Sequence, residues 1–273
     1  MDKRKKTHPI LVASILRIFA TILIFVFHYR GLSKLPNDIP IDKIGITTFL
    51  LLSGYFSFQP NIPPASWLIK RIKQIMIPYW SVISIVLLVN EIVGYKTTDF
   101  FTAIIIFFGG SLFVKDPVYV ISWFITYILI LYICLFIYLL IDNIFLKLVF
   151  IVFSAICLNF AGIKNYLYFF SFYAGYFVHA FFKLNFNGTS NKLLNKINYI
   201  LYQIQGHSYS FFLLHGAILK LVFGVFMFRG TMAFMISFLM TSTVSIFHKI
   251  ISEKIEKFLE YYENKIVTRI SHP

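Results

Sequence analysis

The stretch "SILRIFATILIFVFHYRG", residues 14–31, is an apolar run that contains an arginine, Arg17, and a histidine, His28. A helix needs about 17–25 predominantly apolar residues to cross a lipid bilayer. This run has that length, and similar runs recur along almost the whole chain. It therefore predicts a membrane-spanning helix, in which the two polar side chains require an explanation.

The composition is typical of a membrane protein. The chain has 273 residues, of which 59% are hydrophobic and 13% charged, whereas an average soluble domain is about 45–50% apolar and about 25% charged. The apolar runs predict an all-α fold, a polytopic transmembrane helical bundle of about eight spans (eight to ten). Cys134 and Cys157 lie inside such runs, which favours packing roles over a disulfide. We predict no metal site.

The predicted spans are separated by short polar connections. A further run, residues 100–113, has a length more typical of a re-entrant or interfacial segment than of a span. The eight spans are placed near residues 10–29, 44–59, 75–93, 120–140, 144–162, 165–183, 208–228 and 231–249.

Positive charge gathers at the ends of these spans. The net charge is +14, and in this setting it favours contact with anionic membrane lipids and not with nucleic acid. The segment "KRKK" (residues 3–6) predicts a cytoplasmic N-terminus, and eight crossings return the C-terminus to the same side. We expect a transmembrane domain over residues 1–250 and a cytoplasmic amphipathic tail over residues 251–273.

Arg17 and His28 share one face of the first predicted span. They are eleven residues apart, which is three helical turns plus about 20°, or roughly 16 Å along the axis. Ser14 and Thr21 fall on the same stripe. An arginine within a span costs a few kcal/mol, so the stripe is predicted to face the bundle interior or a hydrated cavity. The alternative is that Arg17 snorkels to the inner interface and His28 marks the outer one.

An arginine followed eleven residues later by a histidine in the first span resembles acyltransferase family 3. This family of membrane-bound acyltransferases includes O-acetyltransferases of bacterial surface polysaccharides. Two departures from its pattern are that the Trp-led span has no Glu, and that Gln74 and Ile75 stand where a second arginine is often found. Four further stretches resemble family motifs in the same order: "TTFLLLSGYF" (47–56), "LIKRIKQIMIPYW" (68–80), "SWFITYILILY" (122–132) and "HSYSFFLLHGAI" (207–218).

The resemblance implies transfer of an acetyl or other short acyl group from acyl-CoA to a hydroxyl of a cell-surface or lipid-linked glycan. The protein would be a multi-pass component of the bacterial plasma membrane, with acetyl-CoA as donor substrate and no tightly bound cofactor. A hydroxyl is a weak nucleophile at neutral pH, and histidine is the usual base. His28 is accordingly predicted to be the base or a transient acyl carrier. Arg17 is predicted to stabilise negative charge or to hold part of the donor.

Other matched residues are predicted to complete the site. Lys70, Arg71, Lys73 and Tyr79 would bind the acyl donor, with the cations on the CoA phosphates. Alternatively, the three cations are positive-inside anchors and the tyrosine is an interfacial aromatic. The remaining candidates, each with a plain packing or interfacial alternative, are Ser53, Trp123, Ser210 and His215.

A transporter or flippase for a lipid-linked glycan or small anion is the main alternative function. Arginine and histidine inside a membrane also suit that role. No internal repeat is evident, however, and few of the predicted helices are interrupted by Gly or Pro. A purely structural membrane component is a third possibility, against which the polar stripe argues. The sequence therefore favours the enzyme.

Overall fold

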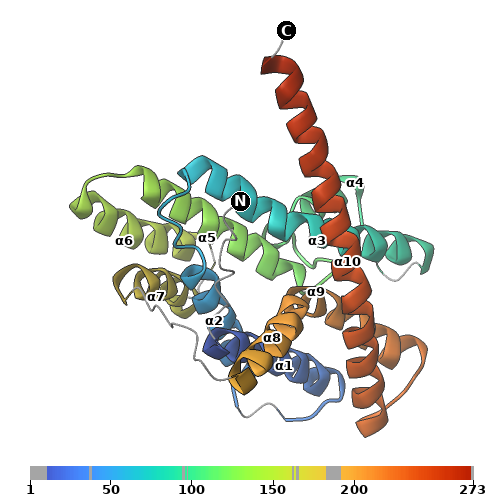
Figure 1. Cartoon of the computed structure of the whole chain (residues 1–273). Helices are drawn as coiled ribbons and strands as arrows, with labels where there is room; N and C mark the ends of the chain where they lie inside the picture. Colours follow the sequence, from blue (N-terminus) through green and yellow to red (C-terminus); the bar gives the residue numbers. More distant parts are fainter. Residues whose placement is uncertain are drawn as a thin grey trace. The chain divides into compact units, whose positions relative to one another are not determined.

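The computed structural model describes residues 11–36, 39–93, 96, 98–161, 163, 166–182 and 192–271, and every regular element in these ranges is helical. A 3-10 turn, η1 (Ser111–Phe113), and a π turn, η2 (Leu221–Val225), accompany the α-helices (Figure 1). The α-helices are α1 (Leu11–Leu32), α2 (Ile41–Tyr55), α3 (Pro64–Val93), α4 (Phe100–Phe107), α5 (Ser122–Leu140), α6 (Ile144–Phe160), α7 (Tyr166–Phe182), α8 (Lys192–Gly206), α9 (Ser208–Lys220) and α10 (Gly230–Ser271).

Each of the eight predicted spans overlaps one of these helices, but some bounds differ: α2 ends at Tyr55 and not near residue 59, and α3 begins at Pro64 and not near residue 75. Among the described residues, five helices are long and apolar enough to cross a membrane: α1, α3, α5, α9 with its π turn, and the first 34 residues of α10. Helices α2, α6 and α7 are shorter, with 15, 17 and 17 residues. The predicted all-α, polytopic fold is confirmed.

The run at residues 100–113 does not form one continuous helix. Its helix α4 has 8 residues, which gives about 12 Å of rise against a hydrocarbon core of about 30 Å. The chain turns at Gly109, whose φ of +80° favours glycine, and then enters η1. This break agrees with the prediction of a short segment in place of a ninth span.

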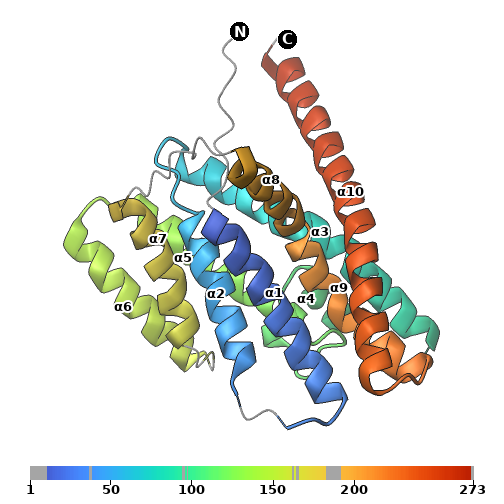
Figure 2. The ribbon, with the colours of Figure 1, turned by 60° about the horizontal axis from the view of Figure 1, so that its bottom comes forward.

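Two helices differ from the sequence-based expectation. Helix α8 was not predicted. Helix α10 is one continuous helix of 42 residues, visible as the long red rod in Figures 1 and 2, and the predicted boundary at residue 250 lies inside it. The cytoplasmic location of residues 251–273 stays a prediction, and residues 272 and 273 lie outside the described ranges.

The chain divides into two compact units, which are described separately. Unit 1 contains residues 1–62 and 137–212, and unit 2 contains residues 63–136 and 213–273. In unit 1, α2 packs between α1 and α7, α8 packs on α1, and α6 packs on α7 (Figure 2). In unit 2, α3 packs against α10 and α4.

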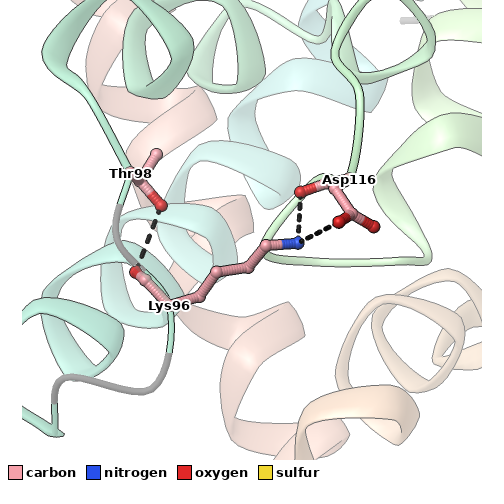
Figure 3. Close-up of polar contacts among 3 residues, drawn as sticks. All are labelled: Lys96, Thr98 and Asp116. Atoms are coloured by element: carbon pink, nitrogen blue, oxygen red, sulfur yellow. Dashed lines mark hydrogen bonds and ion pairs between the residues drawn. The ribbon is translucent and has the colours of Figure 1, made fainter.

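A loop contact inside unit 2 joins the α3–α4 connection to the segment that precedes α5. The Lys96 ammonium donates to the backbone carbonyl of Asp116 and lies 3.5 Å from its carboxylate. The carbonyl of Lys96 in turn accepts a hydrogen bond from Thr98 at 3.5 Å (Figure 3). These contacts hold the loop that leads into the Trp-led helix α5.

Glycines bring the backbones of α2 and α7 into direct contact. A Cβ atom built on Gly54 would lie 1.8 Å from the carbonyl oxygen of Phe172, and one built on Gly175 would lie 1.9 Å from that of Leu51. Small residues permit this approach in membrane helices, where van der Waals packing drives association. The "SG" pair of the second span therefore has a packing function.

Replacing Gly54 or Gly175 with alanine should lower the free energy of unfolding by about 1–3 kcal/mol or more. The reason is that α2 and α7 must separate to admit the methyl group. Gly31→Ala is the matched control, since nothing lies within 4 Å of its virtual Cβ. Thermal unfolding in detergent measures all three variants. Equal stability of the Gly54→Ala and Gly31→Ala proteins would contradict the α2–α7 contact.

Candidate active site

The polar stripe of α1 faces protein in unit 1. Ser14 and Thr21 are only 1% and 6% exposed, and Arg17 and His28 on the same stripe are half-buried. The opposite side of α1 carries exposed apolar side chains such as Phe19. The stripe is thus directed toward the helices that pack on α1.

Arg17 contacts the C-terminal end of α2. Its guanidinium carbon lies 5.2 Å from the ring centroid of Phe56, and its backbone carbonyl accepts a hydrogen bond from Thr21 at 2.8 Å. A cation over an aromatic face gains about 0.5–2 kcal/mol, more when it is desolvated. The aromatic ring thus offsets part of the cost of placing Arg17 in the span.

His179 of α7 belongs to the same end of unit 1, and its partner is the last residue of α2. Its Nδ1 lies 2.6 Å from the carbonyl oxygen of Tyr55, and its ring stacks on that of Tyr55 with centroids 4.3 Å apart. Because a carbonyl only accepts, Nδ1 donates, and in the neutral ring Nε2 is the acceptor. Tyr55 ends α2, where helix carbonyls lack intrahelical partners.

The basic cluster of α3 faces carboxylates of α10 in unit 2. Lys73 forms an ion pair with Glu263, with side chains 32% and 54% exposed. Lys70 and Lys73 also interact electrostatically with Glu256. Arg71 donates to Gln74 on its own helix at 3.4 Å. Binding of a phosphorylated donor by this cluster would compete with these acidic side chains.

Tyr79 is fully buried and holds α4 in place. Its hydroxyl donates to the carbonyl of Ile106 at 2.6 Å, and the indole of the adjacent Trp80 donates to that of Phe107 at 3.1 Å. Both acceptors lie at the C-terminal end of α4. These bonds give the Pro-Tyr-Trp segment a structural role, while the predicted contact of Tyr79 with the donor stays a prediction.

The other candidates occupy buried or half-buried helix positions. Ser53 donates to the Phe49 carbonyl at 2.9 Å, Ser210 and His215 are buried in α9, and Trp123 opens α5 beside Tyr127. The chain's division falls within α9. Unit 1 holds Arg17, His28, Ser53 and Ser210, and unit 2 holds Lys70, Arg71, Lys73, Tyr79, Trp123 and His215.

His248 is a second histidine whose partner could not be read from the sequence. Its Nε2 lies 2.7 Å from Ser81 Oγ and 3.1 Å from the Pro78 carbonyl oxygen. This contact joins α10 to α3 at the proline inside α3. Across the described residues, no three His, Cys, Asp or Glu side chains gather as metal ligands.

Comparison with known proteins identifies the family. Neither the curated proteins nor the solved structures give a match. A family model described as an acyltransferase domain, that of acyltransferase family 3, matches residues 13–197 and so covers α1 to α7 and the start of α8. The match spans well over half of the chain, and the chain belongs to this family of membrane acyltransferases.

Removing the Tyr79 hydroxyl tests its structural role. Tyr79→Phe should lower the free energy of unfolding by about 0.5–1.5 kcal/mol, because the Ile106 carbonyl loses the phenol donor and keeps only the Gly109 amide. Tyr166→Phe, at an exposed position of α7, is the matched control. A raised KM for acetyl-CoA at unchanged stability would instead indicate contact with the donor.

Proposed function

We propose that this acyltransferase moves an acetyl or other short acyl group from acyl-CoA to a hydroxyl of a cell-surface or lipid-linked glycan. The proposal places it in a bacterial plasma membrane with both termini in the cytoplasm. The observation that carries it is the α1 stripe, where Arg17 lies over Phe56 and His28 follows three turns later on the same protein-facing side. Family membership supplies the reaction class.

His28 is the proposed general base. It takes the proton of the glycan hydroxyl as the hydroxyl oxygen bonds to the thioester carbonyl carbon. The tetrahedral intermediate collapses, the carbon–sulfur bond breaks, and the proton passes from His28 to the departing CoA sulfur. A base of this kind contributes about 10²–10⁴-fold to the rate.

Arg17 has a different proposed role because of its distance from His28. The two residues are roughly 16 Å apart along α1, too far for both side chains to contact one reacting carbonyl. We therefore assign Arg17 to binding the donor. The extended pantetheine arm separates the phosphates of CoA from its thioester, so a donor can contact both ends of the stripe. The planar guanidinium is suited to bidentate contact with phosphate.

His28→Ala should reduce acyl transfer by at least about 100-fold, because no base remains for the acceptor hydroxyl. Transfer of labelled acetyl groups in vesicles that contain the purified protein is the measurement. His248→Ala is the matched control and should keep its activity, since His248 lies in the α3–α10 contact. Full activity of His28→Ala would exclude the proposed base, and uptake of a labelled glycan without acyl transfer would favour a transporter.

Arg17→Ala should raise the KM for acetyl-CoA by about tenfold or more, the loss expected for one charged hydrogen-bond partner. The KM of the Arg17→Lys protein should lie between those of the wild-type and Arg17→Ala proteins, because lysine keeps the charge but loses the planar fork. Steady-state kinetics with varied donor at saturating acceptor measures both. A fall in kcat alone at unchanged KM would contradict donor binding.

A further inference from the structure

The antiparallel pairing of α1 and α2 places one acidic residue opposite His28. A Cβ atom on Gly45 would lie 2.8 Å from Ile24 Cγ1 and 3.1 Å from the Ala20 carbonyl oxygen, so these two turns are in register. One turn earlier on α2 is Asp42, and one turn later on α1 is His28. The half-buried Asp42 and His28 thus lie at the same level of the hairpin.

Electrostatics within unit 1 agrees with this register. The charge of the Asp42 carboxylate acts through space on the His28 imidazole and on the phenol of Tyr168 on α7. Tyr168 is buried. Three helices of unit 1 therefore direct polar groups toward one level of the bundle, at the end of α1 opposite to Arg17.

Asp42 was not singled out in the sequence, and a simple explanation for it exists. It lies in the first turn of α2, where a carboxylate stabilises the positive end of the helix dipole. Pro40 at the N-cap gives no side-chain hydrogen bond to this turn. Any further role must therefore be separated from helix stabilisation by experiment.

We propose that Asp42 is the positioning residue of His28. Its negative charge, at the same level of the α1–α2 hairpin, stabilises the imidazolium that forms when His28 takes the proton of the acceptor hydroxyl. Carboxylates fulfil this function for histidine bases in acyl transfer on unrelated folds. The inference rests on the proposed function, and it adds to that function an acidic partner for the base.

Asp42→Asn should lower kcat by about tenfold to a hundredfold, less than loss of the base itself, with an unchanged KM for acetyl-CoA. Asp42→Glu should recover most of the rate. The control is Asp42→Asn combined with Lys43→Asp, which keeps a carboxylate in the first turn of α2 but moves it about 100° around the helix, to an exposed position. It should stay impaired. Recovered activity would assign Asp42 to helix stabilisation and overturn the inference.

A double-mutant cycle separates this inference from the proposed function. In a His28→Ala background, Asp42→Asn should cause no further loss of the residual thiol release from acetyl-CoA, because the two residues act as one unit. Additive losses would overturn the inference. If Asp42→Asn alone fails to insert into the membrane, the double variant with Lys43→Asp takes its place. If the Asp42 variants keep normal activity while the His28→Ala protein is inactive, the inference is overturned and the proposed function is not. If the His28→Ala protein is active, the proposed base is overturned.

Discussion

The cationic side chain of Arg17 inside a membrane span constrains the packing of unit 1. An unpaired charge there costs a few kcal/mol, so α1 must turn this face toward other helices. Phe56 meets the guanidinium at the end of α2, which requires α2 to run antiparallel to α1. The close contact at Gly45 then fixes the register of the two helices. The position of α2 in turn determines where α7 packs.

Helix α1 has a different chemical environment at each of its two ends. The Arg17 end gathers aromatic rings and His179, and the His28 end gathers Asp42 and Tyr168. A helix is stiff over three turns, so the separation of roughly 16 Å is a fixed property of α1. Any substrate that contacts both ends must be elongated. An acyl-CoA has this form, whereas a small anion does not.

Much of the fold follows from local sequence, because a span is a continuous property of about twenty residues. The spacing of Arg17 and His28 is local in the same sense. Helix α8 escaped prediction because its apolar residues are interspersed with polar ones instead of forming a run. The contacts of His179 with Tyr55 and of His248 with Pro78 join a side chain to a distant backbone carbonyl. No side-chain pattern can reveal such an acceptor.

The pairing of the α3 cations with α10 bears on how a donor could bind in unit 2. Lys73 and Glu263 are both substantially exposed, and ion pairs of this kind contribute only about 0–1 kcal/mol. Charge-assisted hydrogen bonds to phosphate are stronger, and a donor with several phosphates offers more than one. Exchange of Glu263 for another anion at Lys73 therefore costs little, and the ion pair is compatible with the donor-binding role predicted from the sequence for the α3 cations. This role is an alternative to the phosphate contact proposed for Arg17, because the two groups of cations belong to different units of the chain.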